Sequence, residues 1–112
     1  MIYRDIIESR SYEYAAPDTP IVIRFGSYDV DVTGFDIDND EKEVTFLTCG
    51  GNFLEIRDLL EIDNDELAEI LDHTVYVESL DGGEYFEADD VYTDIHTSAS
   101  GETLEIFVIF SD

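Results

Sequence analysis

Apolar and acidic residues alternate strictly along residues 28–32, and this pattern constrains the fold more than any other feature of the chain. Successive side chains of a strand point to opposite faces, so Asp29 and Asp31 share one face and the apolar residues share the other. The alternation resumes at 35–38, where Asp36 and Asp38 take the outer positions. The pattern predicts strands with one buried face and one acidic face.

Other stretches have the composition of strands or helices. Runs rich in β-branched and aromatic residues predict strands at 21–25, 43–48, 73–79, 84–97 and 103–110. Apolar residues at helical spacing predict helices within 1–10, 53–61 and 66–71. Residues 11–20, which contain both prolines, are predicted to connect a helix to a strand, and kinks are expected at Thr33-Gly34 and near Ala88.

The two halves of the chain resemble each other in the order of these patterns. YRDII at 3–7 parallels IRDLL at 56–60, and DTPIVIRFG at 18–26 parallels DHTVYVESL at 72–80. Each half then continues through a kinked strand to a polar turn and a last strand. This similarity predicts a tandem αβββ repeat.

The repeat sets the expected architecture. Its halves would span roughly 1–49 and 52–112, within a single domain of residues 1–112. Each half is too small to bury much surface alone, so the two are expected to share a core. We predict an α+β fold with one or more antiparallel sheets and short helices on one face.

The pentapeptide IDNDE occurs at 37–41 and again at 62–66, but the repeat does not place the two copies at equivalent positions. The first copy is predicted to lie in a turn between strands. In the second, Asp63 is predicted to cap a helix, with Glu66 completing a capping box. The identity of the two copies is therefore attributed to a composition rich in Asp and Ile.

The net charge is extreme, because 29 acidic residues face only 5 basic ones and leave a charge of −24. A compact chain of this length has a diameter of roughly 34 Å, which gives about one net charge per 1.4 Å. Duplex DNA carries about one charge per 1.7 Å of its axis. Such a chain repels nucleic acids and anionic membranes and attracts basic proteins. Its 44% hydrophobic content argues against a disordered acidic tail.

Residues 29–40 match the spacing of a calcium-binding EF-hand loop in part, but the flanking segments are strand-like and Asp40 replaces the usual final Glu. His73 and His96 have no metal-ligand spacing, and His73 is expected at a strand start or on the surface. Cys49 is interpreted as structural, because a negative field raises a thiol pKa. No metal, cofactor or catalytic residue is predicted, so we do not expect an enzyme.

The acidic rows are the predicted partner-binding site, because a merely solvated face normally mixes both signs of charge. The predicted residues come from both halves and are Asp29, Asp31, Asp36, Asp38, Asp40, Glu41, Glu43, Asp81, Glu84, Glu87, Asp89, Asp90 and Asp94. Alternate residues along a strand are about 6.6–6.8 Å apart, so these carboxylates would form a rigid row.

The opening residues lack the basic and apolar regions of a signal peptide, and the chain has a single cysteine. Both features predict a cytoplasmic protein in a reducing compartment. The segment 103–110 would present a free sheet edge, so a monomer and a homodimer are both open.

In composition and size, the chain resembles the small acidic proteins that phages and mobile elements use against host nucleases, such as anti-CRISPR and anti-restriction proteins. The resemblance implies an inhibitor that mimics nucleic-acid charge in the basic groove of a nuclease or CRISPR effector, without binding nucleic acid itself. Two alternatives stay open: an immunity protein for a nuclease toxin, and an acidic binding domain from a salt-loving cell.

Overall fold

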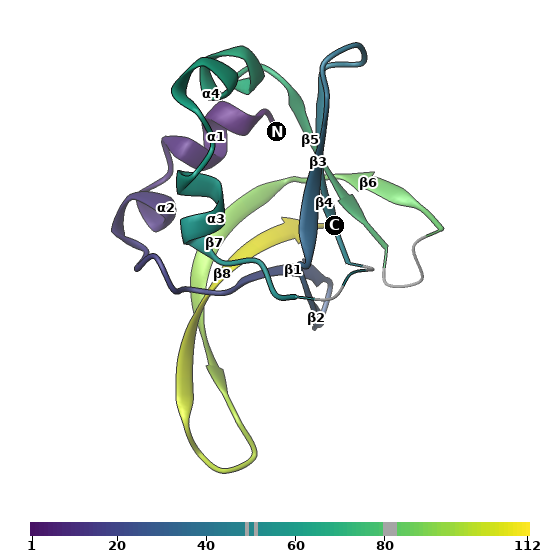
Figure 1. Ribbon diagram of the computed structural model, residues 1–112. Helices are drawn as coiled ribbons and strands as arrows, with labels where there is room; N and C mark the ends of the chain where they lie inside the picture. Colours follow the sequence, from purple (N-terminus) through teal and green to yellow (C-terminus); the bar gives the residue numbers. More distant parts are fainter. Residues whose placement is uncertain (49, 51, 80–82) are drawn as a thin grey trace.

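The computed structural model describes residues 1–48, 50, 52–79 and 83–112. Within them, the helices are α1 (Tyr3–Ile7), α2 (Arg10–Tyr14), α3 (Ile56–Leu60) and α4 (Asn64–Ile70). The strands are β1 (Ile21–Phe25), β2 (Tyr28–Asp31), β3 (Gly34–Asp38), β4 (Glu43–Leu47), β5 (Thr74–Glu78), β6 (Tyr85–Glu87), β7 (Asp90–Thr97) and β8 (Thr103–Ser111). Figure 1 shows the helices gathered on one side of the strands and the β7–β8 hairpin extending away from the rest.

The strands form two four-stranded sheets. The first sheet has the order β2-β1-β8-β7, and the second has the order β3-β4-β5-β6. The α+β class is as predicted, but the prediction of antiparallel sheets is wrong at their centres. The central pairs β1/β8 and β4/β5 are parallel. Each central pair joins strands from opposite halves of the chain, a long-range pairing that local patterns cannot reveal.

The predicted kinks are points where the chain passes from one sheet to the other. The amide of Val32 donates to Ile21 in the first sheet, whereas the next amide, of Thr33, donates to Leu47 at the end of β4 in the second. The second half behaves in the same way, because neighbouring amides at Ala88 and Asp89 also donate to different sheets. The predicted strand 84–97 is therefore two strands, β6 and β7.

The predicted αβββ unit is consequently wrong in detail, since the described residues of each half form two helices and four strands. Helix α2 was missed inside the predicted connector, where the Ser9 hydroxyl accepts a hydrogen bond from the Tyr12 amide and begins the helix. Exchanging β1–β4 with β5–β8 converts the strand order of each sheet into that of the other. The origin of the halves as a sequence repeat stays a prediction.

Short helices α1 and α3 are held by contacts from the opposite half. Five residues do not form a stable helix alone, because helix nucleation is unfavourable. In each helix an aspartate in the first turn, Asp5 or Asp58, accepts a hydrogen bond from the residue before the helix. The first amide of α1 donates to the carbonyl of His73, and the first amide of α3 donates to that of Thr19. Each helix is thereby attached to the segment that precedes the other half's first strand.

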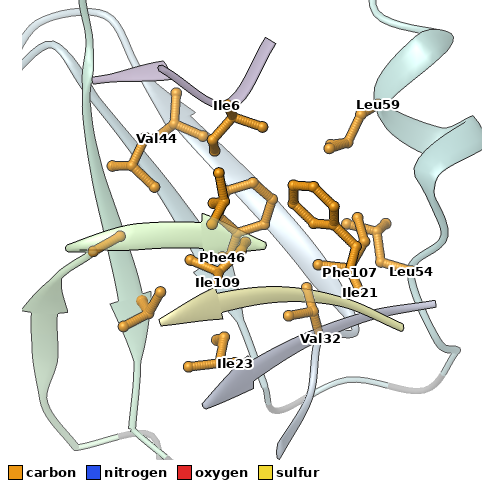
Figure 2. Packing of buried hydrophobic residues seen from close by; sticks show 14 of the residues in the cluster. Ile6, Ile21, Ile23, Val32, Val44, Phe46, Leu54, Leu59, Phe107 and Ile109 are labelled. Carbon is orange, nitrogen blue, oxygen red and sulfur yellow. The ribbon is translucent and has the colours of Figure 1, made fainter. Parts of the chain in front are cut away.

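One hydrophobic core contains residues from both halves, as Figure 2 shows. Phe46 of β4 and Phe107 of β8 are fully buried at its centre. Ile6 of α1 and Leu59 of α3 cover it from the helical side. Neither sheet therefore buries its inner face without the other and without the helices.

The two IDNDE copies lie where the sequence predicted, the first in a turn between strands and the second at the start of a helix. In the first, the Asp38 carboxylate accepts hydrogen bonds from the amides of Asp40 and Glu41 and closes the β3–β4 turn. In the second, Asp63 accepts from the Asp65 amide and caps α4, which confirms the predicted cap. The hydrogen bond by which the Glu66 side chain would complete the predicted capping box does not occur among the described residues.

His73 directly precedes β5, which agrees with the predicted strand start, but it is buried and does not lie on the surface. Its ring Nε2 lies 2.9 Å from the side-chain oxygen of Asn39, the centre of the first IDNDE copy. Its backbone bonds to both Ile70 and Tyr3 at the same time. The buried ring thus ties the β3–β4 turn of one half to the start of β5 in the other.

Candidate functional site

The structure divides the predicted acidic row between two sheets. Asp29 and Asp31 lie on the outer face of β2 in the first sheet, while Asp36 and Asp38 lie on the outer face of β3 in the second. The alternation was predicted correctly within each strand, but the sheet switch at Val32 separates the two pairs. The two outer faces are therefore two distinct candidate surfaces.

Arg24 pairs with two carboxylates on the first sheet's outer face. Its guanidinium donates to both carboxylate oxygens of Asp29, from Nε at 2.6 Å and from Nη2 at 3.0 Å. Its Nη1 donates to Asp94 at 2.8 Å, and its guanidinium carbon lies 5.7 Å from the centre of the Tyr92 ring. Hydrogen bonds to Asp29 and Asp94 raise the pKa of Arg24, and its hydrogen bond lowers the pKa of Asp94. Two predicted partner-binding acids are thus already paired within the chain.

Replacing Arg24 with Met is expected to lower the free energy of unfolding at pH 7 by about 1–2 kcal/mol, because charge-assisted hydrogen bonds are lost. Arg24 depresses the pKa of Asp94, so this stabilisation is present above the unfolded pKa of about 3.9 and is lost as pH falls through the folded value. Urea denaturation at several pH values should show the difference between wild type and variant shrinking in acid.

Arg24→Lys is the matched control for this prediction. It keeps the positive charge but cannot bond both oxygens of Asp29 in the same planar geometry, so an intermediate loss is expected. A difference that is the same at neutral and acidic pH would show that Arg24 contributes by packing alone.

The second sheet's outer face carries carboxylates without an arginine among them. The strand register places Asp36, Thr45, Tyr76 and Glu87 in one row across the sheet, and Asp38 and Glu43 lie opposite each other in the next row. We define the acidic face as the carboxylates of β3, its turn and the start of β4. These residues are Asp36, Asp38, Asp40, Glu41 and Glu43.

No ion pair engages the acidic face within the described part of the chain. The one cation in its turn is the exposed Lys42, placed among four carboxylates in sequence. In the alignment of the halves, the position of Arg24 is taken in the second sheet by Glu78. Glu78 is buried and accepts hydrogen bonds from the amide and hydroxyl of Thr48. The two faces therefore have opposite charges at corresponding positions.

A hollow of about 370 Å³ lies on this same face. Asp36, Asp38 and Glu43 line one part of it, and the side chains of Tyr76 and Tyr85 line another. Acid and aromatic side chains together suit a lysine or arginine, through ion pairing and contact with the ring faces. Tyr76 was not identified from the sequence. Tyr76 joins Asp36 only through the parallel pairing of β4 with β5.

The remaining predicted acids that the structure describes are not part of the acidic face. Asp90 lies with Asp94 on the first sheet, and Asp89 accepts a hydrogen bond from the Asp112 amide. Glu87 lies on the second sheet but contacts the N-terminal ammonium at 3.5 Å. Glu84 is exposed just before β6, and Asp81 lies outside the described residues.

Residues 29–40 do not form an EF-hand loop, because they belong to β2, β3 and the turn that follows. Among the described residues, no group of three or more histidine, cysteine or acidic side chains is arranged to hold a metal ion. Cys49, interpreted from sequence as structural, lies outside the described residues.

The molecule is elongated and not spherical. Its longest dimension is 45 Å and its radius of gyration is 13.4 Å. The net charge of −24 therefore corresponds to about one charge per 1.9 Å of the long axis, a lower density than the 1.4 Å estimated from sequence. It is still close to the 1.7 Å of duplex DNA.

Comparisons with protein-family models, with curated proteins and with solved structures found no match to this chain. No helix in the described ranges is long and apolar enough to cross a membrane. What the chain does is therefore inferred from the charges and contacts of its own surfaces.

Proposed function

We propose that this protein is an inhibitor that binds a basic nucleic-acid-binding groove, such as that of a defence nuclease or CRISPR effector, and imitates the charge of nucleic acid. The observation that carries the proposal is the difference between the two outer faces. On the first, Asp29 and Asp94 are already paired with the chain's own Arg24, while no ion pair engages the acidic face of the second among the described residues. Carboxylates held on paired strands lose little entropy when a partner's cations bind them.

Inhibition would occur by occlusion, without chemistry on the target. The acidic face would take the place of phosphates against arginine and lysine side chains, and its hollow would receive one such side chain between the carboxylates and the tyrosines. Association would be fast and sensitive to ionic strength, because the whole chain is negative. The protein would act in the cytoplasm, where such targets meet nucleic acid.

Affinity capture from a host lysate, followed by mass spectrometry, tests the proposal. Captures at about 50 mM and about 200 mM salt are compared, because phosphate-like contacts weaken steeply over this range. The expected result is one dominant basic nucleic-acid enzyme that competing DNA or RNA displaces. A secreted nuclease toxin as the sole target would instead favour an immunity protein. Retention of many unrelated basic proteins, unaffected by competitor, would contradict both.

A further inference from the structure

A second hollow, of about 300 Å³, lies on the first sheet's outer face, away from the acidic face. We refer to it as the β8 groove. Its lining is largely apolar and is supplied by Pro20, Val22, Phe53, Leu104 and Ile106, with Asp29, Asp31 and His96 beside them.

The groove exists because β8 continues beyond β1. Strand β1 pairs with β8 only from Phe107 onward, whereas β7 pairs with β8 from Thr103. Residues 103–106 therefore have a neighbouring strand on one side only, in the hairpin that extends from the body in Figure 1. An open edge of this kind can pair with an added strand.

Two large apolar side chains are left exposed at the groove. Phe53 is 68% exposed and Leu104 is 51% exposed. Single exposed apolar residues are ordinary, but here they line one hollow together with the buried Val22 and Ile106. The surface is therefore suited to take up an apolar side chain from outside.

The charges beside the groove select the occupant. The Asp29 carboxylate is held by Arg24, but the carboxylate of Asp31 has no hydrogen bond or ion pair among the described residues. A second copy of this chain would bring its own −24 charge against these carboxylates. A segment of a basic protein is attracted by the same field.

We propose that the β8 groove binds an extended segment of a partner protein in which an aliphatic residue lies two positions from a lysine or arginine, so that both side chains point to the same face. The aliphatic side chain packs against Leu104, Ile106 and Phe53, and the cation faces Asp31. This contact is independent of the proposed function, because it lies on the other sheet and uses none of the acidic face. It would give binding a component that salt does not weaken.

The test uses the full chain and a synthetic peptide of about eight residues in which Leu and Lys take turns at every second position, with Thr between them, because side chains on one face of a strand recur every two residues. Binding is followed by amide chemical shifts in solution NMR at about 0.15 M salt. Shifts confined to β8, β1, Asp31 of β2 and the region of Phe53 are expected. A control peptide with Ser in place of Leu keeps the charge and is expected to bind at least about tenfold more weakly.

Two variants locate the site. Leu104→Ser, at an exposed position, is expected to weaken peptide binding about tenfold. Ile95→Ser is the matched control, since Ile95 belongs to the same hairpin, is 57% exposed and does not line the groove. Equal effects of the two variants, equal binding of the two peptides, or shifts confined to the acidic face would each overturn the proposal. So would self-association of the free protein that Leu104→Ser abolishes, because the occupant would then be a second copy.

Discussion

Reversing three charges of the acidic face, with Asp36, Asp38 and Glu43 changed to Lys, is expected to weaken binding of the basic target by about a hundredfold or more. Each change removes an attraction and adds a repulsion, and charge pairs at interfaces are commonly worth several kcal/mol when one partner is lost. All three side chains line the same hollow, so their effects should reinforce one another. The measurement is the dissociation constant and association rate at two salt concentrations.

The control for this variant must change the net charge equally without touching either outer face. Glu8, Glu61 and Glu69 are exposed acids at or near the C-terminal ends of α1, α3 and α4, where lysine suits the helix dipole. Each triple moves the net charge from −24 to −18. A loss of binding that is the same in both triples would show that total charge, and not this face, attracts the target.

Neutral replacements separate lost attraction from new repulsion. Asp36→Asn, Asp38→Asn and Glu43→Gln together should weaken binding less than the lysine triple, and should also reduce the dependence of affinity on salt. Unchanged affinity in both triples on the acidic face would assign the interface elsewhere on the molecule.

Replacing Phe107 with Ala is expected to destabilise the protein by about 3–5 kcal/mol, the usual cost of removing a buried phenyl ring. Phe107 is fully buried where both sheets and the helices meet, and its ring packs edge-on against Tyr12 at 6.1 Å. Small domains have only about 5–15 kcal/mol of stability, and the charge of −24 opposes compaction. The variant should therefore be largely unfolded at low salt and pH 7.

Salt should partly restore the Phe107→Ala variant, because screening relieves the self-repulsion of the compact state. Urea denaturation followed by circular dichroism, at about 0.05 M and about 0.5 M NaCl, measures both effects. Ile95→Ala is the control, since that side chain is exposed on the extended hairpin and should change stability by less than about 0.5 kcal/mol. A wild-type protein that is itself unfolded at low salt would favour the alternative of a salt-adapted acidic domain.

Local patterns predicted which side of β3 faces water. In β3, Phe35 and Ile37 pack against the core while Asp36 and Asp38 are exposed, as the alternation predicted. The cap at Asp63 and the breaks near Thr33 and Ala88 were also visible in the sequence, because caps and breaks depend on neighbouring residues. Charge and alternation together were enough to identify an acidic strand face as the candidate site.

Only the tertiary structure decided which carboxylates share a surface. Neighbouring amides at Val32 and Thr33 donate hydrogen bonds to different sheets. No local sequence pattern predicts that the chain passes from one sheet to the other at this point. The long-range pairings that follow bring Arg24 to Asp94 and place Tyr76 in the row of Asp36. The carboxylates of one predicted row therefore lie on two faces, one where Arg24 pairs with Asp29 and Asp94, and the other the acidic face. The direction of each side chain within a strand follows from the strand's period of two residues. Which strands lie beside it depends on how both halves of the chain pack around one shared core.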